Sequence, residues 1–156
     1  MEALKHREII LDTGPSFLLL GGRYNPQKLD KISFTEEQFG ILLSYIHQFN
    51  KSMVTPHVLA EMSNLAGNRL KEHFPEFMEQ TAVFLQEVQE EHIKKEEIIA
   101  KNNRKLLIDF GITDAALALA SGKDRIILTA DHSFFQYCYN NGIPALHLEA
   151  VFNKAV

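Results

Sequence analysis

The sequence predicts one α/β domain, a three-layer sandwich in which helices cover both faces of a mostly parallel sheet of four to five strands. Short apolar runs alternate along the chain with segments whose apolar residues recur every three to four positions, as expected for strands and amphipathic helices. The strand candidates are short apolar runs, which is typical of a parallel sheet with helices on both faces. The 156 residues suit a single domain, residues 1–156, and no linker or internal repeat divides them.

The chain opens with an apolar run at residues 8–11, which we predict to be a buried strand, followed by a turn at residues 12–15. A short helix is expected at residues 16–20. The pair Gly21-Gly22 should end this helix, because glycine is common at helix ends. Residues 23–33 have the composition of a loop.

Two helices with clear start signals follow. Thr35 and Gln38 have the spacing of a capping box, which predicts a helix with one apolar face directly after it. Residues 52–55 form the second predicted strand. Thr55 and Pro56 then supply a cap and a first-turn proline for the next helix, whose apolar positions are Val58, Leu59, Met62 and Leu65.

The remaining elements are helices and two further strands. Helices are expected near residues 75–90 and within residues 93–108. Residues 111–114 should start another helix, with Thr113 as its cap, and this helix should be buried because residues 115–120 are apolar on every side. A strand, a helix and a last strand are predicted at residues 125–129, 133–139 and 144–147.

Composition and charge argue against a disulfide-bonded protein, a membrane-spanning protein and a protein with a broadly basic surface. The single cysteine, Cys138, excludes an internal disulfide, fits a reducing cytoplasm and lies among aromatic residues as a buried thiol would. No apolar run approaches the ~20 residues that cross a bilayer, and the first residues lack a signal-peptide pattern. The net charge of −4 argues against a broadly basic nucleic-acid surface. An acidic site can still meet phosphates through bound cations.

Four carboxylates stand at positions that favour a site. Asp12 and Asp131 each follow a predicted strand, and ligands of parallel sheets bind at the carboxyl ends of the strands. Asp114 lies in the first turn of the predicted buried helix, and Glu61 lies in the helix opened by Thr55. Each also has a simpler explanation, such as a turn residue or a partner of the helix dipole.

Together, the four carboxylates predict a cation site. Two carboxylates about 4 Å apart repel by roughly 4 kcal/mol at an effective dielectric of 20. Four in one pocket must take up protons or bind a cation. Oxygen-only ligands in an open site suit Mg²⁺ or Mn²⁺, which can activate water for phosphodiester cleavage.

The segments that carry these acids resemble those of the PIN-domain nucleases, in particular the VapC-like toxin ribonucleases, and the resemblance covers nearly the whole chain. Asp12, Glu61, Asp114 and Asp131 match the four acids of that family in order. They lie in the segments IILDT at 9–13, TPHVLAEM at 55–62, GITDAALALA at 111–120 and ILTADHSF at 127–134.

The resemblance implies a metal-dependent endoribonuclease that cleaves single-stranded RNA, with the four acids as catalytic residues and as ligands of Mg²⁺ or Mn²⁺. It also implies a homodimer and, for the toxin of a toxin–antitoxin pair, a small antitoxin protein as partner. Two departures stand out: Ser133 occupies a place where many relatives have a further acid, and Gly14-Pro15 replaces a small polar residue. The stretch from Arg69 to Lys105 is long for a minimal toxin, which leaves an RNA-processing enzyme open.

Other residues have weaker claims to a role. The Thr13 and Thr129 hydroxyls could orient a carboxylate or satisfy the backbone. His132 is more simply a structural histidine. The basic stretch between residues 94 and 105 reads as a solvated helix face, because Glu96 and Glu97 balance it.

Other α/β enzymes fit the sequence less well. A phosphatase of the haloacid-dehalogenase type would need a second aspartate two residues after Asp12, where Gly14 stands. A dinucleotide-binding turn would need more glycines, and there is no P-loop. The remaining rival is a PIN-like module that binds RNA or protein without cleaving it.

Overall fold

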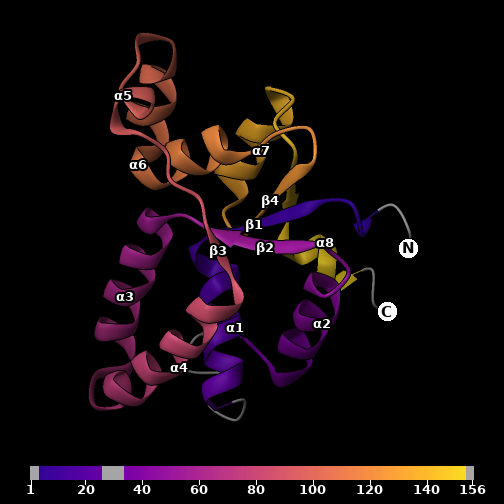
Figure 1. The fold of residues 1–156 in the computed structure, drawn as a ribbon, viewed down its shortest axis with the longest axis vertical. Coiled ribbons are helices and arrows are strands. Elements are labelled where there is room, and N and C mark those ends of the chain that lie inside the picture. The colour runs from indigo at the N-terminus through magenta and orange to yellow at the C-terminus, as the bar shows by residue number, and fades with distance from the viewer. Residues whose placement is uncertain (1–3, 26–33, 154–156) are drawn as a thin grey trace.

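A computed structural model of the chain describes residues 4–25 and 34–153. Its centre is a sheet of five strands in the order β3-β2-β1-β4-β5 (Figure 1), and every pair of neighbours is parallel. The strands are β1 (Glu8–Leu11), β2 (Lys51–Val54), β3 (Gln89–Glu90), β4 (Arg125–Thr129) and β5 (Ala145–His147). The predicted three-layer α/β architecture is confirmed.

Eight α-helices are described, together with two short 3-10 helices, η3 (Lys71–His73) and η4 (Lys101–Asn103). The α-helices are α1 (Thr13–Tyr24), α2 (Glu36–Ile46), α3 (Pro56–Leu70), α4 (Phe74–Glu87), α5 (Lys95–Ile98), α6 (Arg104–Ala120), α7 (His132–Asn140) and α8 (Leu148–Asn153). None of the helices in these described ranges has both the length and the apolar character that a bilayer-spanning segment requires.

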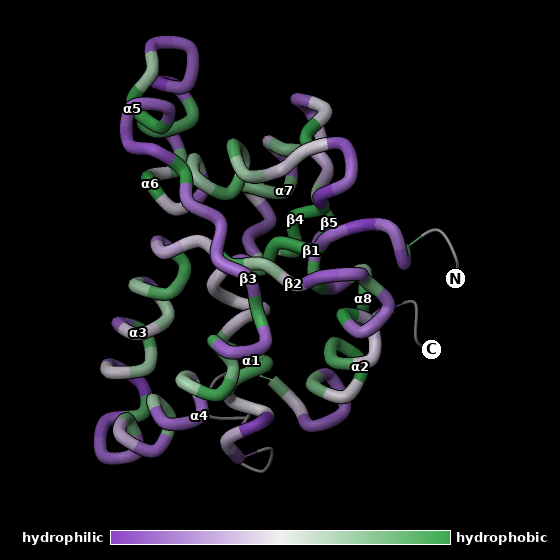
Figure 2. Tube along the Cα trace, in the orientation of Figure 1, coloured by the Kyte–Doolittle hydropathy of each residue, from purple (hydrophilic) through white to green (hydrophobic). Residues whose placement is uncertain are grey.

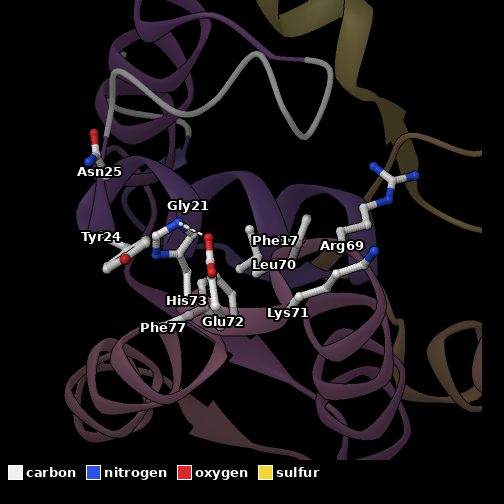
Figure 3. Close-up of a pocket in the computed structure, with 10 residues that line it drawn as sticks. All are labelled: Phe17, Gly21, Tyr24, Asn25, Arg69, Leu70, Lys71, Glu72, His73 and Phe77. Carbon is white, nitrogen blue, oxygen red and sulfur yellow. Dashed lines mark ion pairs between the residues drawn. The ribbon is translucent and has the colours of Figure 1, made fainter.

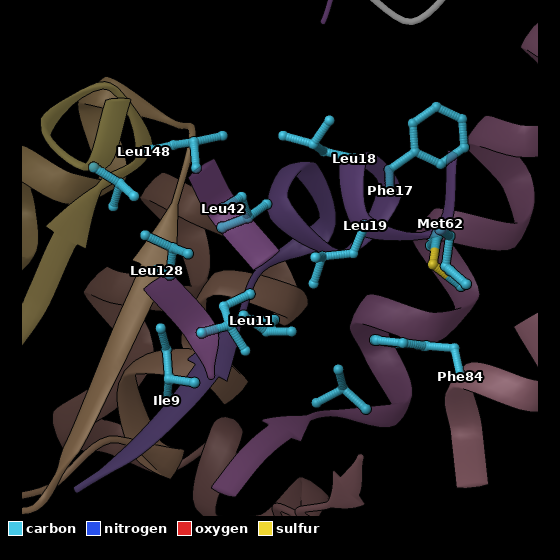
Figure 4. Close-up of a cluster of buried hydrophobic side chains, with 14 of the residues drawn as sticks. Ile9, Leu11, Phe17, Leu18, Leu19, Leu42, Met62, Phe84, Leu128 and Leu148 are labelled. Carbon is cyan, nitrogen blue, oxygen red and sulfur yellow. The ribbon is translucent and has the colours of Figure 1, made fainter. Parts of the chain in front are cut away.

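The two faces of the sheet carry separate hydrophobic clusters, because side chains alternate along each strand. Ile9 and Leu11 belong to the cluster under α1, α2 and α8, which Figure 4 shows, whereas Ile10 packs on the other face with residues of α6 and α7. The hydropathy of the chain agrees for the central strands, since β1 and β4 carry apolar segments, whereas the edge strand β3 is hydrophilic (Figure 2). Burial on both faces explains why residues 9–11 of β1 are apolar without alternation.

The order of the strands places the predicted acids at one edge. β1 is central and pairs with β2 on one side and with β4 on the other, so the chain reverses its winding direction between β1 and β4. Asp12 and Asp131 follow these two neighbouring strands, as predicted. In open parallel sheets this switch point, at the carboxyl ends of the strands, is where ligands bind.

The glycine pair in α1 does not end the helix, so the predicted short helix was wrong. α1 begins directly after Asp12 and continues through Gly21 and Gly22 to Tyr24. A β-carbon at Gly22 would come within 2.1 Å of the Phe39 ring in α2, so this glycine allows the two helices to pack closely. Residues 26–33 of the predicted loop lie outside the described residues.

Gly22 and Gly40 should therefore respond oppositely to alanine. In a helix interior, alanine is favoured over glycine by about 1 kcal/mol. Gly40→Ala should gain this stability, since a β-carbon there has no neighbour within 4 Å. Gly22→Ala should lose about 1–3 kcal/mol through overpacking against Phe39. Urea unfolding of both variants tests the contact, and equal stabilisation by both would contradict it.

The middle of the chain differs from the prediction in detail. The helix predicted near residues 75–90 ends at Glu87, and the unpredicted edge strand β3 follows. The helix expected within residues 93–108 is divided into α5, η4 and the start of α6. The helix α8 was also not predicted. Short elements such as these carry too few residues for a periodic pattern to show.

The buried helix starts within residues 111–114, as predicted, but its cap was predicted wrongly. α6 has non-helical backbone at Gly111, with φ of 87° and ψ of −176°, and Thr113 lies inside the helical segment that follows rather than at its cap. The prediction of a buried segment holds for Ala115, Ala116, Leu117 and Ala120. Cys138 is buried, as predicted.

Candidate functional site

All four predicted acids line one open cleft at the carboxyl edge of the sheet. The cleft has a volume of about 480 Å³. Asp12 follows β1, Glu61 lies in α3, Asp114 lies in α6 and Asp131 follows β4. Four segments far apart in the sequence thus bring their carboxylates to one place, as the sequence analysis predicted.

Asp12 is the most buried of the four, with a relative exposure of 7%. It caps α1: its Oδ1 accepts a hydrogen bond from the Thr13 N–H at 2.6 Å, and its Oδ2 accepts one from the Thr129 hydroxyl at 2.5 Å. Burial raises the pKa of the Asp12 carboxyl and outweighs these hydrogen bonds, which lower it. The nearby charges of Glu61 and Asp131 raise this pKa further.

Glu61 is held between two helices by threonine hydroxyls. Its Oε2 accepts a hydrogen bond from Thr13 at 2.9 Å, and its Oε1 accepts one from Thr113 at 2.6 Å. Thr13 is in α1 and Thr113 is in α6, so the carboxylate links these helices to α3. The capped start of α3 places Glu61 there: Thr55 accepts a hydrogen bond from the Val58 N–H, and Pro56 begins the helix.

Asp131 caps α7 and is tied to the same threonine as Asp12. Its Oδ1 accepts a hydrogen bond from the Phe134 N–H at 2.9 Å, and its own N–H donates to the Thr129 hydroxyl at 2.9 Å. Thr129 therefore joins the ends of β1 and β4 through one buried hydroxyl. The next residue, His132, packs its ring against His147 with the ring centres 5.7 Å apart.

The pKa of Asp114 reflects the negative charge that is concentrated in the cleft. Burial raises its pKa to about 7, and the charges of Asp12, Asp131 and Glu61 contribute in that order. An aspartate in water has a pKa near 4. The cleft thus gathers more negative charge than it can hold without a proton or a cation.

Replacing Thr129 should test whether its hydroxyl supports the site. Thr129→Val keeps the shape but leaves the buried Asp12 Oδ2 without its donor, which should cost about 1–3 kcal/mol. Thr129→Ser keeps the hydroxyl and should lose less. Chemical denaturation of the two variants provides the comparison, and a valine variant as stable as wild type would show that the hydrogen bond contributes nothing.

The hydrogen-bonding role was predicted for two of the three threonines that contact the acids. Thr13 and Thr129 were candidates for orienting a carboxylate, and both do so. Thr113 was predicted to be a helix cap, and its contact with Glu61 was missed, because the two residues lie 52 positions apart in the sequence. No local pattern reveals such a pair. Ser133, where a further acid was considered, is exposed in the first turn of α7.

The carboxylates are not arranged as a closed ligand shell. Within residues 4–25 and 34–153, no three His, Cys, Asp or Glu side chains are grouped so that they could hold a metal ion as they stand. Hydrogen bonds to threonines and backbone N–H groups occupy oxygens of Asp12, Glu61 and Asp131 instead. The donor set itself consists of oxygens alone, which suits Mg²⁺ or Mn²⁺ bound through one or two carboxylates and water.

A second cavity, of about 370 Å³, lies at the other end of α1 (Figure 3). Phe17 and Phe77 form part of its apolar lining, with ring centres 5.4 Å apart, and Arg69 and Lys71 lie at its edge. None of the four predicted acids lines it. This cavity is therefore separate from the cleft that the four acids line.

Comparisons with known proteins add no family to this description. No protein-family model matches the chain, and a search of curated proteins finds no significant match.

Proposed function

We propose that this protein is a metal-dependent endoribonuclease of the PIN-domain type that cleaves single-stranded RNA. The observation that carries the proposal is the convergence of Asp12, Glu61, Asp114 and Asp131 from four separate elements on one open cleft at the switch point of a parallel sheet. The resemblance of the surrounding segments to PIN-domain nucleases supports the choice of RNA.

The cleft has the chemistry of a Mg²⁺ or Mn²⁺ site. Asp12, Glu61, Asp114 and Asp131 offer only oxygen ligands, and the raised pKa of Asp114 indicates an excess of negative charge. A bound cation would supply Lewis acidity for activation of water and would neutralise charge on the phosphodiester. Because the site is open, it leaves room for water and for phosphate oxygens beside the carboxylates.

The side chains of the cleft have distinct parts in this proposal. Asp12 accepts hydrogen bonds from the Thr13 N–H and the Thr129 hydroxyl, so its carboxylate would be held in a fixed orientation toward a cation. Glu61 is exposed and is oriented by two hydroxyls. Asp114, with a pKa of about 7 in the metal-free protein, holds a proton that a cation would displace.

The direct test is cleavage by the purified protein. We expect it to cut a single-stranded RNA oligonucleotide in the presence of Mg²⁺ or Mn²⁺, and to cut the same RNA in a duplex much more slowly. A chelator should stop the reaction and added Mn²⁺ should restore it. Binding of RNA without cleavage would favour the alternative of a non-catalytic PIN-like module, and cleavage undiminished by chelator would overturn the metal-dependent mechanism.

Two biological settings remain part of the proposal. A toxin would bind a small antitoxin protein and would stop growth when expressed alone, whereas an RNA-processing nuclease would not. Both settings place the protein in the cytoplasm, which agrees with the unpaired thiol of Cys138.

The proposal also includes a homodimer. Many apolar residues of α2 and α4 pack into the core, among them Leu42 and Phe77, whereas Val83 and Leu85 stay exposed on α4 and are available for an interface. Light scattering at tens of micromolar should give twice the 17.8 kDa of one chain. Val83→Asp should reduce that mass by burying a charge in the interface, and a wild-type monomer would contradict the prediction.

A further inference from the structure

Phe110 brings an apolar ring into a cleft that is otherwise acidic. Among the described residues that line the cleft, it is the one aromatic side chain, and none is lysine or arginine. Cationic side chains that usually hold nucleic-acid phosphates are therefore absent from this lining. A polynucleotide in the cleft needs another source of binding energy besides the cations.

The position of Phe110 is well defined. It is the last residue before the break at Gly111, where the φ of 87° suits glycine. Its ring packs against Tyr137 and Phe134 of α7, with ring centres 4.9 and 5.9 Å apart and planes tilted by 53° and 56°. Phe134 is fully buried, so the neighbouring helix supports the ring from the side of the core.

Phe110 itself is only half-buried. A ring that served the core alone would be expected to be covered, as that of Phe134 is. Phe110 lines the same cleft as Asp114, which stands four residues further along α6. An apolar ring held rigidly beside a phosphodiester-cleaving site is suited to stacking on a nucleobase, because every base has a π-face.

We propose that Phe110 is a substrate-binding residue that stacks on a nucleobase next to the scissile phosphodiester and so selects unpaired nucleotides. This inference rests on the proposed ribonuclease function. Bases in a duplex stack on one another and cannot reach the ring, whereas bases of single strands can splay onto aromatic side chains. Stacking also tolerates different sequences, since it does not read hydrogen-bonding edges.

The first test compares substrates with and without bases. The wild type should cleave an ordinary single-stranded RNA with a higher kcat/KM than an RNA of the same length in which several ribose units lack their bases. Phe110→Ala should reduce this preference by about 5- to 150-fold, which corresponds to the loss of one stacked base. Phe110→Leu keeps an apolar side chain against Tyr137 and should lose the preference as well, whereas Phe110→Tyr should keep it.

A second test detects stacking without cleavage. The chain contains no tryptophan, so Phe110→Trp introduces a single fluorescent reporter into the cleft. Tyr139→Trp introduces one at an exposed position near the end of α7, outside the lining of the cleft. In the presence of Mg²⁺, the ordinary oligonucleotide should quench the fluorescence of the Phe110→Trp protein. The base-free oligonucleotide should quench it much less, and the Tyr139→Trp protein should respond to neither.

The outcomes separate this inference from the proposed function. If wild type cleaves RNA but Phe110→Ala and Phe110→Leu, folded as shown by their thermal melts, keep the preference for bases, the stacking role is wrong. If wild type cleaves neither RNA, the ribonuclease proposal fails. The quenching of the Phe110→Trp protein then decides the stacking role alone, and equal quenching by both oligonucleotides would overturn it.

Discussion

Asp12→Asn is expected to abolish metal-dependent cleavage of RNA while leaving the fold intact. Loss of residues that only orient metal ligands costs about 10- to 100-fold in metal affinity or activity. Loss of a charged ligand itself should therefore reduce kcat/KM by about 100-fold or more. Single-turnover cleavage at saturating Mn²⁺ gives the most direct comparison.

The fold should tolerate this change for specific reasons. Asparagine is as good a helix cap as aspartate, and its Oδ1 can still accept from the Thr13 N–H. Its amide can donate to the Thr129 hydroxyl, which reverses the direction of the present hydrogen bond. The substitution also removes one of the charges that repel one another in the cleft. We therefore expect a melting temperature equal to that of wild type or higher.

Asp124→Asn is the matched control for this prediction. Asp124 is an exposed aspartate that directly precedes β4, at the end of the strand opposite to Asp131, and it lines a different cleft. The same chemical change there should leave cleavage at the wild-type rate. Equal cleavage by the Asp12→Asn protein and wild type would remove Asp12 from the mechanism.

Asp114 should make the metal-free protein less stable as the pH rises from about 4 to about 7. Its pKa is about 7 in the folded protein, raised by burial and by the neighbouring acids, against a value of 3.8 in the absence of these effects. Between these two pH values the folded state holds a proton that the unfolded state has lost. The free energy of unfolding therefore falls with pH across this interval and levels off above it.

The size of this effect is limited by the partial exposure of Asp114. A shift of one pKa unit corresponds to about 1.4 kcal/mol, and screening by water at a site that is not fully buried reduces the total. We expect a loss of about 1–3 kcal/mol across the interval. Asp114→Asn cannot ionise, so it should remove most of this pH dependence and stabilise the protein at pH 7.5.

Urea unfolding in the presence of chelator at pH 5 and pH 7.5 measures this difference. Asp109→Asn serves as the control, because Asp109 is in the same helix but pairs with Lys105 at 2.5 Å outside the cleft. If wild type and Asp114→Asn show the same pH dependence, the carboxylates do not interact as strongly as the structure indicates.

The larger features of the fold could be predicted from the sequence because their signals are local. The apolar runs at Ile9–Leu11 and Ile126–Leu128 mark buried strands, and the capping box of Thr35 and Gln38 forms as predicted. Asp12 and Asp131 could be predicted as site residues because each directly follows a strand, and ligands bind at the carboxyl ends of parallel strands. The features that were missed depend on distant residues.

Two examples show why the remaining features could not be predicted from the sequence. Gly22 lies inside α1, where the lack of a β-carbon leaves room for the Phe39 ring, and the sequence around Gly22 says nothing of that neighbour. Thr113 donates to Glu61 rather than to its own helix, a choice set by the approach of α3 to α6. In both cases a tertiary contact overrides the local preference of the residue.

The most direct test of the central claim is a Mn²⁺ titration of the purified protein, followed calorimetrically at pH 6 and pH 7.5. The four-carboxylate site predicts saturable binding by wild type, with more protons released at pH 6 because Asp114 is then mostly protonated. It predicts much weaker binding by Asp12→Asn and unchanged binding by Asp124→Asn. Equal binding by all three proteins, or no binding by wild type, would contradict a metal site in this cleft.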